Sequence, residues 1–292
     1  MEALDTRIET HPSAGQCDVS VIILTYNEEK NIRQALDSVV GWAKEIVIVD
    51  SFSTDSTLEI CREYDCVIEQ NRFVDYSKQR NFALDLSLNG SWILFLDADE
   101  WVPPVLSAEI ARSISSASGE SGFYMKRRLI WMGSWVRRGY YPVWILRLFR
   151  NGFGRCEERS VNEHIVVDGT VGYLDNDLMH EDRNGLGPWL QKHVRYAQLE
   201  AAELKKCHAT GPQAGSQASK RRWQKEKIYN RLPRFTRCIL FFFYRTLLRG
   251  GVLDGPIALT YHILHSLWYR FVIDLFDLQD QIQRVGCGRS VE

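Results

Sequence analysis

Short apolar runs alternate with polar, helix-like segments over the first hundred residues of the chain. Residues 19–24, 45–50, 66–69 and 91–97 are rich in β-branched and aliphatic side chains. Runs of this length and composition, bounded by polar residues, predict buried strands. Four such strands in succession, each about 20 to 25 residues after the last, set the framework of the fold.

The segments between these strands have the periodicity of helices. Residues 32–40 place apolar side chains three and four positions apart, which is one helical stripe. Residues 53–64 and 75–88 predict two more helices, and Ser53 or Thr54 would cap the first of these. Strands that alternate with helices predict an α/β fold, in which a mainly parallel sheet is flanked by helices.

The middle of the chain is less regular. Residues 122–133 and 140–152 read as strands interrupted by aromatic and basic side chains, which is typical of an antiparallel addition to the sheet. Residues 185–206 predict a long helix with Pro188 in its first turn. The small, polar residues 209–219 are the best candidate for a linker.

Four regions follow from these patterns. Residues 1–17 are expected to form a flexible tail, because they are polar and lack an apolar core. Residues 18–208 would be the folded α/β domain, and residues 209–219 the linker. Residues 220–292 would form a basic, amphipathic helical region.

This last region differs in composition from the rest. Between residues 220 and 249 lie ten basic residues and one acid, with aromatic and aliphatic side chains interleaved. The apolar residues 256–278 follow, but charged and histidine side chains interrupt both stretches, and a spanning helix needs about 20 continuous apolar residues. Residues 220–278 therefore predict helices that lie in the surface of an anionic membrane. A dimer interface and an RNA-binding tail are the alternatives, and we expect no nucleic-acid partner.

Overall composition adds little. The 292 residues are 45% hydrophobic and 25% charged, as in a folded protein, and the net charge of −1 indicates no polyanionic partner. Seven scattered cysteines form no CxxC pair, so neither a disulfide framework nor a zinc site is predicted. A reducing, cytosolic setting fits this pattern best.

Polar residues follow three of the predicted strands, in the stretches "TYNE", "DSFSTD" and "DADE". Carboxyl ends of parallel strands meet at one edge of a sheet, and ligands bind beyond that edge. In "DADE", Asp97 and Asp99 would point the same way if strand geometry persisted, since alternate residues share a face. They would then hold a divalent cation such as Mg²⁺ or Mn²⁺, which prefers oxygen ligands. The alternative is an ordinary solvated acidic loop.

Four motifs in this order resemble the nucleotide-sugar half of family 2 glycosyltransferases with a GT-A fold. They are "VIILTYNEEKNIRQALDSV", "EIVIVDSFSTDSTLEI", "QRNFALD" and "WILFLDADEWV". The similarity covers residues 18–150 firmly and extends more loosely to about residue 205. Within the family the chain is similar to the branch of lipopolysaccharide-core and other bacterial envelope glucosyltransferases, which "RGGVLDGPIAL" also resembles.

The resemblance implies roles for residues along the sheet edge. Asp99 would contact the metal, and Asp97 would contact the ribose or the metal through water. Asp50 would contact the nucleobase. The remaining donor-site candidates are Thr25, Tyr26, Asn27, Glu28 and Arg80. Asn27 and Glu28 have an alternative role as caps of the next helix, and Arg80 as a surface cation.

An inverting sugar transfer, which the resemblance implies, needs a carboxylate that removes the proton of the acceptor hydroxyl. Glu163, Asp182 and Glu181 are the candidates, in that order. The assignment of the base role to Glu163 by resemblance is weakened because Asn162 stands where the related branch has a histidine. His180 is a further candidate metal ligand, as a neutral imidazole.

The sequence thus predicts a metal-dependent inverting glycosyltransferase. It would move a hexose from a nucleotide-sugar, most simply a UDP-sugar, to a lipopolysaccharide-type or lipid-linked acceptor at the cytoplasmic face of the inner membrane. Two alternatives stay open. A nucleotidyltransferase acting on a sugar phosphate also uses acidic metal sites, although "LTYNEEKN" lacks the usual glycine-rich loop. A non-catalytic membrane or sugar-binding scaffold is the other.

Overall fold

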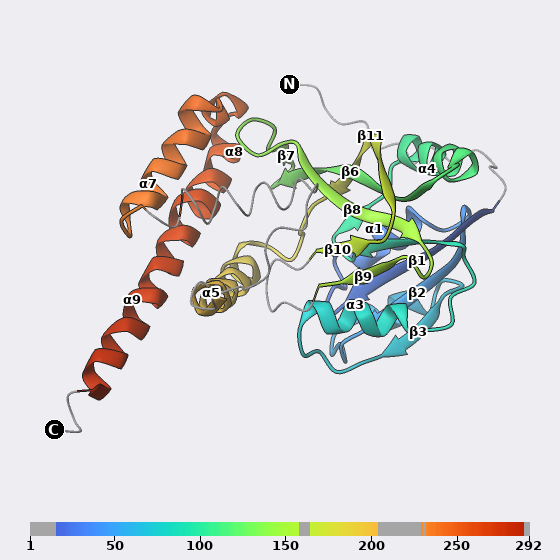
Figure 1. Ribbon diagram of the computed structural model, residues 1–292, viewed down its shortest axis with the longest axis horizontal. Helices are drawn as coiled ribbons and strands as arrows, with labels where there is room; N and C mark the ends of the chain where they lie inside the picture. The colour runs from blue at the N-terminus through green and yellow to red at the C-terminus, as the bar shows by residue number, and fades with distance from the viewer. Residues whose placement is uncertain (1–15, 158–163, 204–228, 230–231, 289–292) are drawn as a thin grey trace.

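The computed structural model describes residues 16–157, 164–203, 229 and 232–288. A nine-stranded sheet forms the centre of the molecule, with helices on both faces and a group of C-terminal helices at one end (Figure 1). The strands of the large sheet are β1 (Cys17–Thr25), β2 (Ala43–Asp50), β3 (Val67–Gln70), β4 (Trp92–Asp97), β5 (Glu100–Trp101), β6 (Glu120–Trp131), β7 (Ser134–Trp135), β8 (Val143–Arg150) and β11 (Thr170–His180). β9 (Gly154–Cys156) and β10 (Ile165–Val167) form a separate hairpin.

The strand order of the large sheet is β3-β2-β1-β4-β8-β6-β11-β5, with β7 paired to β6. β3, β2, β1 and β4 are parallel to one another, and β8 is antiparallel to both of its neighbours. The predicted α/β class with a mainly parallel sheet is therefore confirmed. The antiparallel addition predicted at residues 122–133 and 140–152 is confirmed by β6 and β8. β11, which was not predicted from the sequence, pairs parallel with β6.

The parallel strands read as continuous apolar runs because both of their faces are buried. On one face, Val21 and Ile23 of β1 pack with α1 (Ile32–Asp37), α2 (Thr57–Cys61) and α4 (Pro104–Ser116). On the other face, Ile22 packs with α3 (Tyr76–Leu84) and with the β9–β10 hairpin. Figure 1 shows α3 and α4 on opposite sides of the sheet.

Local caps differ from the sequence-based expectation at one helix. α2 begins at Thr57, and its N-cap is Ser56 rather than Ser53 or Thr54. Ser53 and Thr54 instead bond to other loops: the Ser53 Oγ donates to Asp50, and the Thr54 amide donates to Asn27 Oδ1 over 2.8 Å. α3 begins as predicted, since the Asp75 side chain accepts from the Lys78 amide.

The C-terminal helices form a second core against the end of the sheet. They are α5 (Leu186–Glu203), α7 (Thr236–Phe243), the π-helical η2 (Tyr244–Leu248), the 3₁₀ turn η3 (Gly251–Asp254), α8 (Pro256–Tyr261), the π-helical η4 (His262–Trp268) and α9 (Tyr269–Gly288). Trp131 of β6, Trp189 of α5 and Tyr261 of α8 pack together in this core. None of the helices in the described parts of the chain combines the length and the apolar character needed to cross a membrane. The proposed linker 209–219 and most of the tail 1–17 lie outside the described residues.

The "RGG" stretch at residues 249–251 joins the C-terminal helices to the loop after β7. Gly250 has a φ of 71°, in the left-handed region that favours glycine. A Cβ at Gly251 would lie 2.7 Å from His262 Nε2, so the close approach requires glycine there. Asp254 Oδ1 then accepts from Arg138 Nη1 over 3.1 Å. These contacts bring η3 onto residues 137–139, close to the strand ends.

Candidate active site

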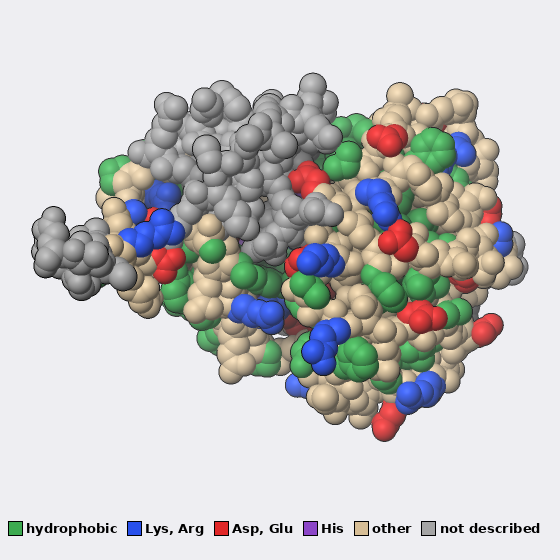
Figure 2. All heavy atoms as spheres, turned by 60° about the horizontal axis from the view of Figure 1, so that its bottom comes forward, with side chains coloured by type: hydrophobic (Ala, Val, Ile, Leu, Met, Phe, Trp, Pro, Cys, Tyr) green, Lys and Arg blue, Asp and Glu red, His purple; other side chains and the backbone are tan. Residues whose placement is uncertain are grey.

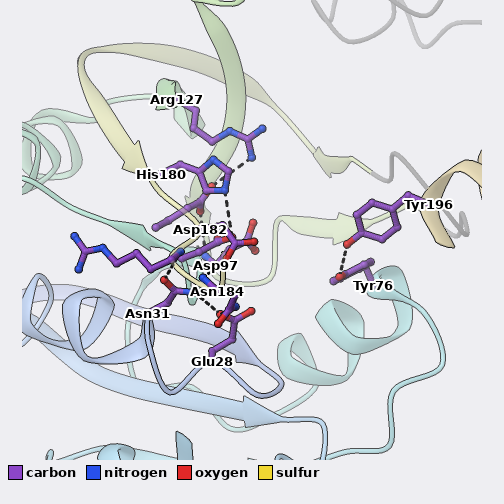
Figure 3. Close-up of polar contacts among 12 residues, drawn as sticks. Glu28, Asn31, Tyr76, Asp97, Arg127, His180, Asp182, Asn184 and Tyr196 are labelled. Atoms are coloured by element: carbon purple, nitrogen blue, oxygen red, sulfur yellow. Dashed lines mark hydrogen bonds and ion pairs between the residues drawn. The ribbon is translucent and has the colours of Figure 1, made fainter. Parts of the chain in front are cut away.

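The carboxyl ends of β1, β2 and β4 meet at one edge of the sheet, as the sequence predicts. Thr25 is in register with Asp50, and Leu24 with Asp97. β11 adds a fourth strand end, because it pairs antiparallel with β5 and sets His180 opposite Glu100. The structure thus brings together residues that are up to 155 positions apart in the sequence, several of which are seen in Figure 3.

Asp97, the last residue of β4, is bound by two arginines. Arg80 Nη2 of α3 lies 3.2 Å from Asp97 Oδ1, and Arg147 Nη2 of β8 donates to Asp97 Oδ2. Burial would raise the pKa of Asp97, but the guanidinium groups of Arg147 and Arg80 outweigh it and lower that pKa to about 2. Asp97 is therefore a carboxylate at every physiological pH, and it binds the guanidinium groups of Arg80 and Arg147 at the strand end.

Asp99 points to a different partner. The chain turns after Asp97, and β5 begins at Glu100, so strand geometry does not persist through "DADE". The expectation that Asp97 and Asp99 share one face is therefore wrong. Asp99 Oδ2 lies 3.2 Å from His180 Nε2. Burial opposes ionisation of Asp99, but His180 and Lys192 outweigh it and lower the pKa of Asp99.

His180 completes this pair from the end of β11. Burial would lower the pKa of His180, but the Asp99 carboxylate outweighs burial and raises it. His180 Nδ1 is buried and has no hydrogen-bond partner among the described residues. A buried nitrogen with no partner costs free energy unless a ligand or water satisfies it, so the imidazole has capacity for one more contact.

Glu100 is buried beneath Asp97 and organises its surroundings. Its Oε2 accepts from the Asp97 amide over 3.1 Å, and its Oε1 lies 3.4 Å from Arg147 Nη2 and 3.5 Å from Arg127 Nη1. Burial raises the pKa of Glu100 despite these arginines. Glu100 therefore fixes the Asp97 backbone and the two arginines at the end of β4.

The loop after β1 carries the donor-site candidates Thr25 to Glu28. Tyr26 is 56% exposed, so its ring is free to stack on a base, and Thr25 Oγ1 is buried without a partner among the described residues. Asn27 has a φ of 54°, and its Oδ1 accepts from the Thr54 amide. The alternative role of Asn27 and Glu28 as helix caps is wrong, because the N-cap of α1 is Asn31.

Glu28 lies at the centre of a set of amides. Its Oε2 accepts from Asn31 Nδ2 over 2.7 Å and from Asn184 Nδ2 over 3.0 Å. Burial and the neighbouring Asp99 raise the pKa of Glu28 to about 7. Glu28 thus ties the β1–α1 loop to the segment after His180, as the dashed lines in Figure 3 show.

Asp50 is fully buried at the end of β2. Its carboxylate accepts from the Ser53 amide and hydroxyl, and Gln70 Nε2 donates to Asp50 Oδ2 over 2.9 Å. These bonds fix both the carboxylate and the loop 51–53. Asp50 is held rigidly at the edge where the resemblance implies a nucleobase contact.

The three base candidates differ in their surroundings. Glu163 lies outside the described residues and stays a prediction. Glu181 Oε2 accepts from Arg183 Nε over 3.0 Å, in an ion pair. Asp182 accepts from the Asn184 amide over 2.9 Å and lies among the site residues in Figure 3. Its charge raises the pKa of both Glu28 and Lys192, so it acts on charged groups of the site.

Sequence reasoning missed Lys192 and Tyr196 of α5. The Tyr196 hydroxyl is 2.6 Å from the Tyr76 hydroxyl of α3 and holds α5 against the sheet domain (Figure 3). Lys192 lies one turn before Tyr196 on the same helix face. Burial would lower the pKa of Lys192, but Asp99 in particular outweighs it and raises that pKa. The signal in the sequence was the i, i+4 spacing of a cation and a tyrosine on the predicted helix 185–206.

Most of the aromatic and basic side chains of β6, β7 and β8 described next stabilise the fold rather than line the strand ends. Arg150 pairs in register with Trp92, at the opposite end of β4 from Asp97, and its Nε donates to the Glu120 carbonyl over 2.9 Å. Trp131 lies in the C-terminal core. Trp135 lies 4.1 Å from the Arg128 guanidinium. Only Arg147 of this group reaches the site.

The chemistry of the donor set fits a divalent cation in part. The described residues contain no group of three or more His, Cys, Asp or Glu side chains arranged as a complete metal site. Two atoms of the types that bind such a cation, Asp99 Oδ2 and His180 Nε2, lie 3.2 Å apart. Mg²⁺ binds its ligands at about 2.1 Å in octahedral geometry, so adjacent ligands lie about 3 Å apart. The remaining ligands would then come from the substrate and water.

Comparison with known proteins identifies the family. The model of glycosyl transferase family 2 matches residues 20–157. The lipopolysaccharide core biosynthesis glycosyltransferase LpsC of Rhizobium meliloti is 30% identical over 195 residues, which cover 63% of this chain and 70% of LpsC. The chain belongs to glycosyltransferase family 2. As a glycosyltransferase, it is neither the nucleotidyltransferase nor the silent scaffold that the sequence left open.

Other similarities agree with this family. An uncharacterized glycosyltransferase of Rickettsia typhi is 29% identical over 200 residues, covering 64% of this chain and 68% of the relative. Among solved structures, S. aureus TarS in complex with UDP is 17% identical, covers 91% of each chain and gives a TM-score of 0.47. That structural similarity is too low to bear on ligand or mechanism.

Proposed function

We propose that this glycosyltransferase moves a hexose from a UDP-sugar to a lipopolysaccharide-type or lipid-linked acceptor, with inversion at the anomeric carbon and with a divalent cation. The observation that carries the proposal is the pair Asp99 Oδ2 and His180 Nε2, 3.2 Å apart at the edge where β1, β2 and β4 end. The acceptor class rests on the similarity to LpsC, whose name states a role in lipopolysaccharide core biosynthesis. The site of action would be the cytoplasmic face of the inner membrane.

The cation would be held by Asp99 and His180, with Asp97 close by. When bound, it would neutralise charge on the diphosphate as the bond to the sugar breaks. Lys192 faces the same region from α5, and its positive charge supports this neutralisation. Asp97 is an acceptor for donor hydroxyls, because Arg80 and Arg147 keep it ionised.

The uridine would lie over the loop after β1. The Tyr26 ring is exposed for stacking, the Thr25 hydroxyl lacks a partner among the described residues, and Asp50 is fixed by Ser53 and Gln70. Arg80 and Asn27 fix the surrounding loops. These are the interactions expected of a site that orients a nucleotide before the sugar reacts.

Asp182 is our choice of base among the described carboxylates. The base would take the proton of the acceptor hydroxyl as that oxygen attacks the anomeric carbon and the diphosphate leaves from the opposite side. Glu181 is committed to Arg183, whereas Asp182 accepts only a local amide in the described contacts and lies among the site charges. Glu163 remains the second candidate.

The test is a transfer assay with the full-length protein, stripped of metal and then given Mg²⁺ or Mn²⁺ and a panel of UDP-sugars. We expect metal-dependent release of UDP, and a product whose anomeric proton shows inversion by NMR. Asp182→Asn should lower turnover at least about a hundredfold, the usual contribution of a general base. Glu181→Gln is the matched control and should stay within about fivefold of the wild type, and Glu163→Gln tests the other carboxylate.

Three results would count against the proposal. Release of pyrophosphate instead of UDP, or no binding of any nucleotide-sugar, removes the proposed donor chemistry. Full activity of the metal-free protein removes the cation. Loss of activity in Glu181→Gln or Glu163→Gln, with Asp182→Asn unaffected, reassigns the base.

A further inference from the structure

The helical segment formed by α7 and η2 has its polar side turned inward and its apolar side turned outward. The buried side chains on this segment are Arg237, Cys238, Arg245 and Thr246. Six large side chains, which we call the outer face, are 43 to 80% exposed: Ile239, Leu240, Phe243, Tyr244, Leu247 and Leu248. They repeat every four residues and so form one stripe. An ordinary surface helix shows the reverse arrangement.

Charged contacts fix this orientation from the inside. Arg237 Nε donates to Asp274 Oδ1 of α9 over 2.8 Å, and Asp274 Oδ2 accepts from the Phe235 amide over 2.8 Å. Arg245 Nε donates to the Gly139 carbonyl over 2.7 Å, and its Nη1 donates to Ser266 Oγ over 3.0 Å. Rotation of the helix to bury its leucines would leave both guanidinium groups without these partners, which is costly.

The exposed apolar surface extends beyond the outer face. Leu253 of η3 is 70% exposed, and Ile257 of α8 is 41% exposed. Figure 1 shows α7 and α8 at the end of the molecule away from β3. A large exposed apolar surface on a folded protein marks a site of contact with another phase or molecule.

Basic side chains lie at the border of this surface. Arg249 directly follows the outer face and is exposed, and Arg137 and Arg138 are exposed on the loop that contacts η3. Asp254, the acid of η3, is already bound to Arg138. In the sequence, ten basic residues and one acid lie between residues 220 and 249. Apolar side chains with exposed arginines nearby complement a bilayer with anionic headgroups.

We propose that the outer face of α7–η2, continued by Leu253, docks this enzyme on an anionic lipid surface. The leucines and Phe243 would enter the acyl region, while Arg249 and Arg137 would meet the headgroups. The inference deepens the proposed function and rests on it for the nature of the acceptor, because a lipid-borne acceptor is met at a membrane. It also explains the inner contacts of Arg237 and Arg245, which keep the apolar stripe facing outward.

The experiment is co-sedimentation of the full-length protein with phosphatidylcholine vesicles, with and without phosphatidylglycerol. We expect the wild type to bind the anionic vesicles, and Leu247→Glu/Leu248→Glu to lower its partition coefficient at least about tenfold, since two leucines lose their burial in lipid. Val105→Glu is the matched control, because Val105 on α4 is 60% exposed and Leu247 is 61% exposed. It should bind as the wild type does, and high salt should weaken binding only partly.

Two controls separate weaker vesicle binding from loss of the fold: urea unfolding of the double variant, and a second variant in another segment. The leucine pair is already exposed to water, so the double variant should unfold at the wild-type urea concentration. Leu253→Glu, in a separate segment, provides an independent variant that should also weaken vesicle binding. Failure of the wild type to bind anionic vesicles, or unchanged binding by both variants, overturns the docking surface.

Two further outcomes separate the alternatives. A wild-type dimer in light scattering that the leucine variants convert to a monomer would show that the outer face contacts a second copy, which also overturns the proposal. Hydrolysis of UDP-sugar without vesicles is measured in parallel. Donor hydrolysis without vesicle binding removes the docking surface alone, and vesicle binding without donor turnover removes the proposed function alone.

Discussion

The carboxyl edge of the sheet and the α7–η2 segment both bury charged side chains, but the consequences differ. At the sheet edge, arginines and carboxylates surround polar atoms that still lack a partner among the described residues, such as Thr25 Oγ1 and His180 Nδ1. In α7–η2, Arg237 has its carboxylate and Arg245 its carbonyl, and the apolar side chains are the ones left to the solvent. The sheet edge thus leaves buried polar atoms for a polar ligand, whereas the hydrogen bonds of Arg237 and Arg245 orient an apolar surface.

The rest of the surface gives a background for this comparison. On the face seen in Figure 2, basic and acidic side chains are interspersed over the sheet domain. The exposed ion pair of Arg155 and Asp85, 2.6 Å apart, is typical of such a surface and contributes little to stability. Neither the sheet edge nor α7–η2 resembles this background.

The largest effect is expected at Asp99. Asp99→Asn keeps the shape of the side chain but removes the charge that binds His180 and would bind the cation. We expect kcat/KM to fall at least about a thousandfold, which is roughly 4 kcal/mol, because the charge on the leaving diphosphate is no longer balanced. UDP release in the transfer assay measures this.

Asp85→Asn is the control for Asp99→Asn, since Asp85 lies in the exposed pair with Arg155. It should leave kcat/KM unchanged. Activity of Asp99→Asn within tenfold of the wild type would mean that Asp99 does not help to neutralise the charge of the leaving diphosphate. The sheet edge would then not be the polar ligand site of the comparison.

The sequence predicted the residues at the sheet edge well because their positions depend on the local pattern of each strand. Strands β1, β2 and β4 are continuous apolar runs that are buried on both faces, and parallel strands bring their carboxyl ends together whatever the rest of the chain does. Asp50 and Asp97 follow from this alone. The partners did not follow, since Arg147 is 50 positions from Asp97 and Lys192 is 93 positions from Asp99.

The sequence was less informative about the turn in "DADE" and about α7–η2. A period of two implied a shared face for Asp97 and Asp99, but the chain leaves β4 at Asp97 to start β5. The stripe of residues 239–248 is equally visible in the sequence whether it faces inward or outward. Only the bonds of Arg237 to Asp274 and of Arg245 to Gly139, distant in the sequence, decide which side is buried.

A smaller effect is expected at the inner side of α7. Arg237→Met would leave the Asp274 carboxylate, 1% exposed, without its guanidinium. We expect a loss of about 3 kcal/mol in the free energy of unfolding, the usual result when one partner of a buried pair is removed. Urea unfolding followed by tryptophan fluorescence measures it, and Arg237→Met/Asp274→Asn should recover part of the loss because the buried charge is gone.

Arg234→Met is the matched control for Arg237→Met. Arg234 lies 2.8 Å from Asp277 of the same helix α9, but its side chain is 37% exposed, so its loss should cost at most about 1 kcal/mol. Equal losses in the two variants would show that the inner pair has no special part in orienting the outer face.

The finest test of the comparison is the pH dependence of stability at Glu28, a buried carboxylate that accepts two amide N–H groups, from Asn31 and Asn184. Its pKa is raised from 4.5 to about 7. Between these values the folded protein keeps a proton that the unfolded chain has released, so the contribution of Glu28 to stability is highest below pH 4.5 and falls as pH rises to 7. The fall amounts to at most about 3 kcal/mol. Asp97 has the opposite sign, but its lowered pKa acts below 3.8, outside this window. Burial lowers the pKa values of His193 and His262 to about 4, and these groups give a slope of opposite sign in the same pH range, so the test compares variants. Glu28→Gln should lose only the Glu28 contribution to the slope and should be more stable than the wild type above pH 7, whereas Glu29→Gln, an exposed neighbour, should keep the wild-type slope. Because the amides are satisfied by either side chain, an unchanged slope in Glu28→Gln would mean that this part of the sheet edge holds no uncompensated charge, and that the site is as fully matched before a ligand binds as the inner side of α7.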